Sequence, residues 1–156
     1  MTSRNRDRTR YQEGMTLVEL IVTVSILAIL ASAAVPVTRF QVKREREREL
    51  RYDLEQMRDA IDSYKSAADK SAFLIKIDTF GYPPDLNTLV DGVDIQGKKV
   101  KFLRRIPVDP MTGTAEWGLR SLQDDSTSES WGGQNVFDVY SKSQATGLND
   151  RKYSEW

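Results

Sequence analysis

An apolar run from Met15 to Thr38, 24 residues long with one carboxylate near its start, constrains the fold most. At a rise of 1.5 Å per residue, a helix of this length spans roughly 36 Å, enough to cross a hydrocarbon core of about 30 Å. Its apolar side chains cover every helical face, as in a helix surrounded by lipid or by other helices. An ionised Glu19 in hydrocarbon costs about 2.5–3.5 kcal/mol. We therefore expect Glu19 to have a function.

A basic segment precedes this run, because residues 1–14 hold four arginines against two acidic residues. Positive charge before an apolar span favours a cytoplasmic N-terminus and export of the rest of the chain. We therefore expect a membrane-spanning or filament-core helix at 15–38 and an exported domain at 39–156. Over the whole chain, 23 basic residues balance 23 acidic ones. Bulk charge thus predicts no nucleic-acid partner.

Polar residues inside the run have local explanations. The hydroxyls of Thr16, Thr23, Ser25 and Ser32 can donate to main-chain carbonyls of the same helix, so they need no outside partner. Pro36 should kink or locally open the helix, because it lacks an N–H and clashes with the preceding turn.

An ordinary secretory signal is the alternative interpretation of this segment. Residues 1–14 would be its basic region, and Ala31-Ser32-Ala33 would be the cleavage site. That interpretation leaves Glu19 unexplained. The two interpretations differ in mass, since cleavage after Ala33 gives a soluble protein and cleavage after Gly14 gives a membrane-embedded one.

Cysteine and histidine are both absent from the chain. Disulfide bonds, thiolate nucleophiles, Cys/His zinc sites and histidine general bases are therefore excluded. Serine, lysine or carboxylate chemistry stays formally open, but no catalytic set is distinguished by position. We therefore expect a protein that is not an enzyme.

The segment that follows the apolar run predicts an amphipathic continuation of the same helix. A dense charge run at residues 43–49 allows i,i+3 ion pairs and is typical of a solvated helix face. A contact in which opposite charges on neighbouring copies meet is the alternative. An apolar stripe with alternating spacings of 4 and 3 then indicates a helix that packs on a small domain. The stripe consists of Leu50, Leu54, Met57, Ile61, Tyr64 and Ala68. We therefore expect one helix from Met15 to about residue 68.

The remaining sequence predicts short strands, and hence an α+β fold with a small antiparallel sheet packed on the helix. Gly81-Tyr82-Pro83-Pro84 ends any regular element. Asp85 is a candidate cap for a helical turn that reaches Val90. Alternation of apolar and polar residues predicts strands at 99–102, 117–122 and 136–141, and the polar segment 123–134 predicts a loop. We expect Tyr153 and Trp156 to pack the C-terminal tail onto the sheet.

The motif Gly14-Met15-Thr16-Leu17-Val18-Glu19, with the apolar run and Pro36, resembles the N-terminus of the type IV pilin and pseudopilin superfamily. The resemblance implies that prepilin peptidase cleaves between Gly14 and Met15 and methylates the amine of Met15. Residues 1–14 would then be a leader peptide. Members usually have phenylalanine after the cut, so Met15 is a departure, although methionine is similarly large and apolar.

Cleavage would create an α-amino group with a pKa near 8, largely cationic at neutral pH. A buried ammonium and the Glu19 carboxylate are each costly alone but can neutralise one another. Since they lie four residues apart, about 6 Å along the axis, the amine of an axially staggered neighbour could reach this carboxylate. We therefore expect Glu19 to set subunit register during assembly.

Two later blocks and the terminal Trp156 resemble the major pseudopilin of type II secretion. The blocks are Phe102–Pro110 with Trp117-Gly118, and Val136–Ser141. The resemblance implies a pilin-like fold and a homopolymer anchored in the bacterial inner membrane that extends through the periplasm to drive protein export. Its implied partners are further copies, prepilin peptidase, the inner-membrane assembly platform, minor pseudopilins and inner-membrane lipid. A type IV pilin for adhesion or motility, or a single-pass anchored binding domain that never polymerises, are the alternatives.

Many such pseudopilins bind calcium in an acidic C-terminal loop. Calcium takes six to eight oxygen ligands, several of them from carboxylates. The matching loop here offers only Asp150 and Glu155, with three basic residues nearby. We therefore expect no metal and no other cofactor, with Asp150 and Glu155 as weak calcium candidates and Asn149-Asp150 as a turn.

Overall fold

The computed structural model describes residues 14–70, 72–74, 77–125, 128 and 130–156, without the side chains of residues 33–38 and 77. The contacts divide the chain into two units, Met1–Phe40 and Gln41–Trp156. Apart from Gly14, the predicted leader lies outside the described residues. The backbone at Pro36 is helical, its side chain is not described, and the predicted kink or local opening there stays a prediction.

Helix α1 extends from Leu17 to Asp69, which is 53 residues. The prediction of one helix from Met15 to about Ala68 is confirmed within two residues at each end. Among the described residues, no helix is both long enough and apolar enough to cross a membrane.

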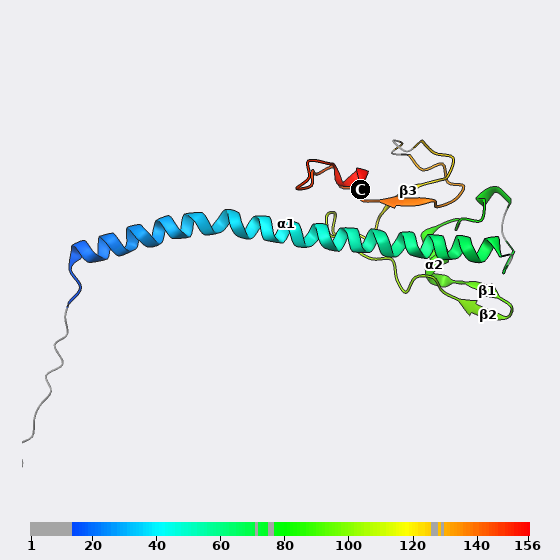
Figure 1. Cartoon of the computed structure of the whole chain (residues 1–156), viewed down its shortest axis with the longest axis horizontal. Coiled ribbons are helices and arrows are strands. Elements are labelled where there is room, and N and C mark those ends of the chain that lie inside the picture. Colours follow the sequence, from blue (N-terminus) through cyan, green and yellow to red (C-terminus); the bar gives the residue numbers. More distant parts are fainter. Residues whose placement is uncertain (1–13, 71, 75–76, 126–127, 129) are drawn as a thin grey trace, which may run out of the picture. The chain divides into compact units, whose positions relative to one another are not determined.

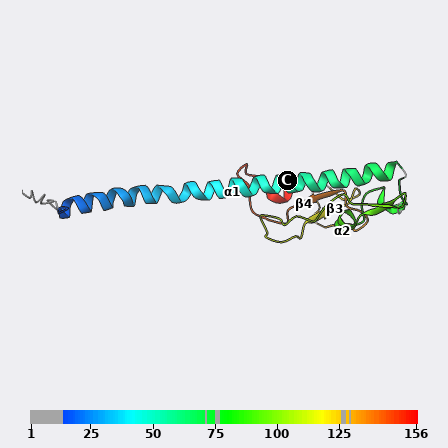
Figure 2. The same ribbon diagram turned by 90° about the horizontal axis from the view of Figure 1, so that it is seen from below.

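The second unit is built on the amphipathic half of α1, and Figure 2 shows its short elements gathered on one side of the helix. Leu50 and Met57 are completely buried, and the other residues of the predicted stripe are at least 95% buried. They pack against Leu89, Trp117 and Val139 from the rest of the unit. Burial of this stripe is the main force that holds the domain on the helix, because each fully buried large apolar side chain contributes about 1.5–3 kcal/mol.

The described residues of this unit include three short helices: η1 (Ile77–Thr79), α2 (Leu86–Asp91) and η2 (Tyr153–Glu155). The side chain of Asp85 accepts a hydrogen bond from the Thr88 N–H at 2.8 Å, so Asp85 caps α2 as predicted. Gly92 ends α2 at φ 82°, and a Cβ there would overlap the main-chain oxygen of Val100.

The strands of the described residues form two separate antiparallel pairs, which confirms the α+β class. Figure 1 shows the first pair, β1 and β2, side by side. β1 (Val93–Ile95) pairs with β2 (Lys98–Val100), and β3 (Gly118–Arg120) pairs with β4 (Asp138–Tyr140). β1 and its hairpin with β2 are additions to the sequence prediction. The predicted strand at 99–102 ends early, because the N–H groups of Phe102 and Leu103 donate to the Leu89 main-chain oxygen instead of to a strand.

Two glycine-dependent features fix these pairs. Gln96 and Gly97 both have positive φ, 54° and 80°, as the tight turn between β1 and β2 requires. In the second pair, a Cβ on Gly118 would overlap the ring of Tyr140, its partner in the register. Gly118 therefore allows this ring to lie flat against β3.

The predicted loop at 123–134 contains no strand among its described residues, but side chains fix its start and end. The Asp124 carboxylate accepts the N–H groups of Ser121 (2.7 Å) and Gly132 (3.0 Å). These main-chain hydrogen bonds lower the pKa of Asp124 below its ordinary value. The indole of Trp131 donates to the Asn135 main-chain oxygen at 2.8 Å, so Trp131 packs against the end of the loop.

Candidate functional site

The predicted cleavage junction lies just before the first turn of α1. Gly14 and Met15 precede the helix, and both are exposed. Apart from the chain neighbours of Gly14, no atom of the described residues lies within 4 Å of the position that a Cβ on Gly14 would occupy. The peptide bond between them is therefore open to an enzyme from this side, while cleavage and methylation themselves stay predictions.

Thr16 caps the N-terminus of α1. Its Oγ1 accepts a hydrogen bond from the Glu19 N–H at 3.2 Å, and its main-chain oxygen accepts the first helical bond, from the Leu20 N–H at 3.1 Å. The prediction that the Thr16 hydroxyl donates to a carbonyl of the helix is therefore corrected. The spacing Thr-x-x-Glu is that of a capping box, in which the first residue satisfies one of the unpaired N–H groups of the first turn.

Glu19 lies in the first turn of α1, where the helix dipole favours a negative charge. Its side chain is exposed, and among the described residues its carboxylate has neither a hydrogen bond nor an ion pair. The fold therefore supplies a favourable local field but no counter-ion. Its predicted role in assembly remains untested by these contacts.

An uncovered apolar surface surrounds Glu19. The large apolar side chains between Leu17 and Leu30 are 48–76% exposed, on all faces of the helix. Thr23, Ser25 and Ser32 donate their hydroxyls to carbonyls three or four residues earlier, at 2.7–2.9 Å, as predicted. Apart from the exposed Glu19 carboxylate, this part of the helix presents apolar side chains and hydroxyls that already donate within the helix.

In the second unit, α1 also holds the C-terminal segment, through polar contacts. Glu47 is almost fully buried, and its carboxylate accepts hydrogen bonds from the Leu148 N–H (2.8 Å) and the Tyr153 hydroxyl (3.0 Å). One turn earlier, Lys43 Nζ donates to the main-chain oxygen of Thr146 at 2.7 Å. None of the i,i+3 ion pairs predicted for residues 43–49 is formed in this described stretch. Glu47 faces the C-terminal segment, which accounts for the missing pair with Arg44.

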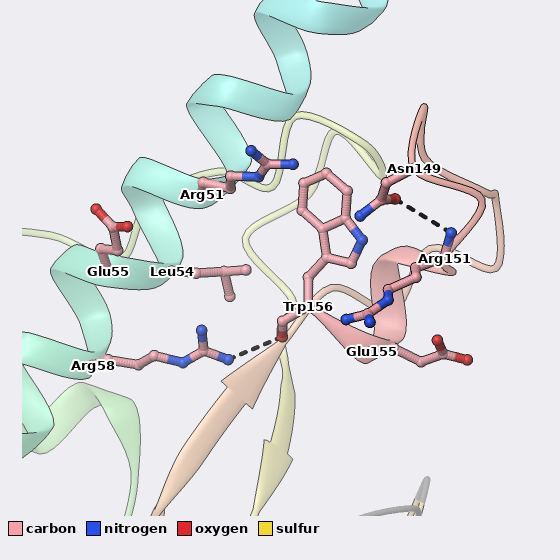
Figure 3. A pocket seen from close by; sticks show the side chains of 8 residues that line it. All are labelled: Arg51, Leu54, Glu55, Arg58, Asn149, Arg151, Glu155 and Trp156. Atoms are coloured by element: carbon pink, nitrogen blue, oxygen red, sulfur yellow. Dashed lines mark hydrogen bonds between the residues drawn. The ribbon is translucent and has the colours of Figure 1, made fainter.

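Burial and the hydrogen bond to Glu47 raise the pKa of Tyr153 to about 12. Further along α1, the guanidinium of Arg51 lies over the ring of Trp156, 4.4 Å from its centroid (Figure 3). Tyr153 and Trp156 also form an edge-to-face ring pair, with centroids 5.1 Å apart. The tail therefore packs on α1 as well as on the strands, which extends the prediction that it would pack on the sheet.

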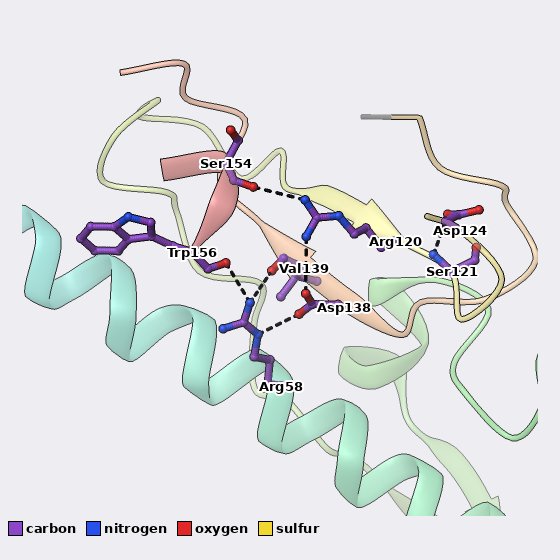
Figure 4. A network of polar contacts seen from close by, with 8 residues as sticks. All are labelled: Arg58, Arg120, Ser121, Asp124, Asp138, Val139, Ser154 and Trp156. Carbon is purple, nitrogen blue, oxygen red and sulfur yellow. Dashed lines mark hydrogen bonds and ion pairs between the residues drawn. The ribbon is translucent and has the colours of Figure 1, made fainter. Parts of the chain in front are cut away.

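The side chain of Arg58 on α1 connects this helix to β4 and to the C-terminal segment (Figure 4). Its Nε donates to Asp138 Oδ1 at 2.8 Å, and its Nη2 donates to the main-chain oxygens of Val139 (3.2 Å) and Trp156 (2.9 Å). Arg120 lies 3.7 Å from the second oxygen of Asp138. One carboxylate on β4 thus bridges arginines from α1 and β3.

Sequence reasoning missed Glu47 and Arg58, although a signal was present. Glu47 lies three residues before Leu50, so it continues the apolar stripe on the same face of α1. A charged residue at a core position requires a partner, because burial of an unpaired charge is costly. The sequence did not indicate that the partner would come from the C-terminal segment, about 100 residues later.

The weak calcium candidates do not form a metal site in the described part of the chain. Asp150 is exposed in a turn at φ 60°, with its N–H donating to the Gly147 oxygen, and Glu155 is exposed on η2. No group of three or more acidic side chains suited to a metal ion is found among the described residues. Calcium takes six to eight oxygen ligands, and the expected absence of a metal stays a prediction.

Comparison with known proteins adds two findings. Residues 9–35 match a family described as the prokaryotic N-terminal methylation motif, and this range includes Gly14, Met15 and Glu19. The chain is also 26% identical over 123 residues to the fimbrial protein EcpB of Eikenella corrodens, an alignment that covers 78% of this chain and 69% of that protein. No solved structure matches the chain.

Proposed function

We propose that the chain is the structural subunit of a type II secretion pseudopilus. The proposal builds on a type IV pilin-like subunit, an assignment that the methylation motif and the fimbrial similarity support. Prepilin peptidase removes residues 1–14 and methylates Met15. The mature chain is held in the bacterial inner membrane through residues 15–38 and is then drawn by the assembly platform into a periplasmic homopolymer that drives protein export.

The observation that carries the proposal is the setting of Glu19. Its carboxylate lies in the first turn of α1, next to an open Gly14–Met15 junction. The large apolar side chains of residues 17–30 around it are uncovered on every face. Uncovered apolar surface of this extent requires lipid or neighbouring helices. An ammonium at Met15 of an adjoining copy would neutralise Glu19 within that cover.

Two blocks of the exported domain favour secretion over the other members of the superfamily. Leu103 and Trp117 from the first block, and Val136 and Val139 from the second, are all in the core. The Trp117 indole donates to the Pro107 main-chain oxygen at 3.0 Å. The sequence likeness to the major pseudopilin therefore lies in residues that determine how the domain packs.

The first test is the intact mass of protein extracted from the membranes of cells that contain prepilin peptidase. We expect the loss of residues 1–14 and the gain of one methyl group. Gly14→Ala is the matched variant and should retain the leader, since its side chain meets no other part of the fold but lies at the cut bond. Wild-type protein that keeps its leader in these cells would refute the processing route.

The second test concerns assembly. Glu19→Ala should abolish filaments, whereas Glu45→Ala, which removes an exposed carboxylate from the same helix, should leave them intact. Normal filaments from Glu19→Ala would contradict the role of Glu19 in register.

The similarity to a fimbrial protein favours a second candidate, a type IV pilin for adhesion or motility. Deletion of the encoding sequence separates the two functions. Loss of protein secretion with surface motility intact would support the pseudopilin, and loss of twitching or adhesion with secretion intact would support the pilin.

A further inference from the structure

The loop between β3 and β4 holds two acceptor oxygens on the same side of Gly132. The position that a Cβ on Gly132 would occupy lies 2.6 Å from Asp124 Oδ1 and 2.8 Å from Gln134 Oε1. The φ of Gly132 is not positive, so the backbone conformation does not require a glycine here. Its missing side chain instead leaves the space in front of the two oxygens open. We call these two oxygens and the space at Gly132 the acceptor site.

The carboxylate of this acceptor site is fixed in place but still has a free oxygen. Asp124 Oδ2 accepts the N–H groups of Ser121 and Gly132, while Oδ1 accepts no hydrogen bond from the described residues. The main-chain hydrogen bonds lower the pKa of Asp124, so it is ionised at neutral pH. Gln134 is exposed. The site thus offers one ionised and one neutral acceptor to a ligand from solvent.

The surrounding segment supplies no cation to this site. Residues 121–141 contain four acidic residues and neither lysine nor arginine. In the described part of the chain, Asp124 forms no ion pair. Figure 4 shows the guanidinium of Arg120 directed away from Asp124, toward Ser154 and Asp138. A counter-ion for Asp124 must therefore come from another molecule.

A lysine ammonium has the chemistry that this site requires. It is a compact cation with three N–H donors, so it can serve both oxygens at once. Trp131, the residue before Gly132, is 39% exposed, and its indole N–H is already used by Asn135. Its ring can therefore cover the methylene groups of an entering lysine. Calcium suits the site less, because two protein oxygens fall short of the six to eight ligands that it takes.

The second unit also carries lysines without ionic partners, on the β1–β2 hairpin. Lys98, Lys99 and Lys101 are all exposed, and none of them forms an ion pair with a described residue. Asp94, the carboxylate on β1, accepts the Gly97 N–H at 2.8 Å and so serves the turn. In the view of Figure 1 the hairpin lies on one side of α1 and the loop between β3 and β4 lies on the other.

We propose that the acceptor site binds the ammonium of Lys99 or Lys101 from a second copy of the chain. These two lysines share one face of the hairpin, because alternate side chains of a strand point the same way. The inference rests on the proposed function, since it requires the homopolymer, but it uses surfaces of the second unit alone. Complementary surfaces on opposite sides of one unit form a heterologous contact, which can repeat from copy to copy along a filament.

Charge reversal tests the contact in the full, processed chain, with the yield of sedimented filaments as the readout. Gln134→Lys supplies Asp124 with a cation from its own chain and should lower the yield about fivefold, the effect of one exposed ion pair lost at each contact. Lys99→Glu/Lys101→Glu should lower it similarly, and the combination of all three changes should restore it. Lys70→Glu/Lys152→Glu reverses two exposed lysines outside both surfaces and should leave the yield unchanged.

The three reversed side chains are exposed, so the melting temperatures should match that of the wild type. Should a reversal lower the melting temperature, a cross-link decides instead, since the chain has no native cysteine. Two differently tagged copies, one with Gln134→Cys and one with Lys99→Cys, should be joined in filaments by a short bismaleimide. Gln134→Cys paired with Lys70→Cys is the matched control and should not be joined.

The outcomes separate this contact from the proposed function. Wild-type filaments with no cross-link, or with unaffected variants, would overturn the contact and leave the pseudopilus role intact. Loss of filaments in both reversed variants without recovery in the combination would overturn the hairpin lysines as the occupant. Absence of filaments from the wild type would count against the proposed function and, with it, against the contact.

Discussion

Residues 17–32 and residues 47–68 of α1 share one helical geometry but differ in what covers their side chains. In the first region apolar side chains point in every direction and are 48–76% exposed. In the second they form one stripe, and Leu50 and Met57 in it are completely buried by the rest of the domain. The first region therefore depends on cover from outside the chain, and the second is covered by the chain itself.

The two carboxylates of these regions show the same contrast. Glu47 accepts two hydrogen bonds from the C-terminal segment of its own chain, and Glu19 accepts none among the described residues. The position of a charge on a helix thus does not decide its role. What distinguishes Glu47 from Glu19 is whether the described part of the same chain supplies hydrogen-bond donors to the carboxylate.

The largest effect should come from matched truncations in the two regions. Leu50→Ala should lower the free energy of unfolding by about 2–5 kcal/mol, because it leaves a cavity in the core. Leu27→Ala removes the same atoms from an uncovered face and should leave the unfolding of the second unit unchanged. Urea denaturation of detergent-solubilised protein measures the free energy of unfolding of both variants. An equal decrease in the two variants would show that the two regions do not differ in how their side chains are covered.

A pH titration should sharpen the contrast next. The Tyr153 hydroxyl has a pKa of about 12 in the folded chain against its ordinary 10.0. The folded state therefore retains this contribution below pH 10 and loses it as the pH rises to about 12, by on the order of 2 kcal/mol. Melting temperatures across this interval measure the loss. Tyr153→Phe should show a shallower decline than the wild type, and an identical decline would contradict the assignment to Tyr153.

Substitution of the buried carboxylate should have a smaller effect. Glu47→Gln retains the shape but replaces charge-assisted hydrogen bonds with weaker neutral ones, so the free energy of unfolding should fall by about 1 kcal/mol. Glu49→Gln removes an exposed carboxylate two residues away and is the matched control. Chemical denaturation of the two variants in parallel should show a loss only for the first.

The smallest expected effect is local to the start of α1. Thr16→Val removes the hydroxyl that accepts the Glu19 N–H, which costs about 1 kcal/mol of helix capping and corresponds to about fivefold faster amide exchange. Thr16→Ser keeps the cap and should exchange like the wild type. Hydrogen exchange at the Glu19 amide measures this, and unchanged protection in Thr16→Val would mean that the hydroxyl does not cap the helix.

The regular half of the fold could be predicted because its signals are local. The alternating spacing from Leu50 to Ala68 identified both the helix and its buried face, and Asp85 identified the start of α2 through a contact three residues away. The Gly14–Glu19 motif could also be recognised, since its residues are adjacent in sequence, and residues 9–35 match the methylation-motif family.

The features that escaped prediction depend on distant partners. The strand expected at 99–102 stops at Val100 because Leu89 supplies an acceptor for the next two N–H groups. The alternation of apolar and polar residues contains no information about that competitor. Likewise, the charge run near Glu47 predicts a solvated helix face. In the structure, the C-terminal segment supplies two hydrogen-bond donors to Glu47 instead.

Gly118 has a consequence that reaches beyond its own strand. Any side chain there would push the Tyr140 ring away from β3, and the guanidinium of Arg120 rests on that ring, 4.3 Å from its centroid. Arg120 also donates to the main-chain oxygen of Ser154 at 3.2 Å. A single added carbon atom at position 118 would thus displace the Tyr140 ring. Through that ring it would also disturb the Arg120 guanidinium and its hydrogen bond to Ser154 in η2.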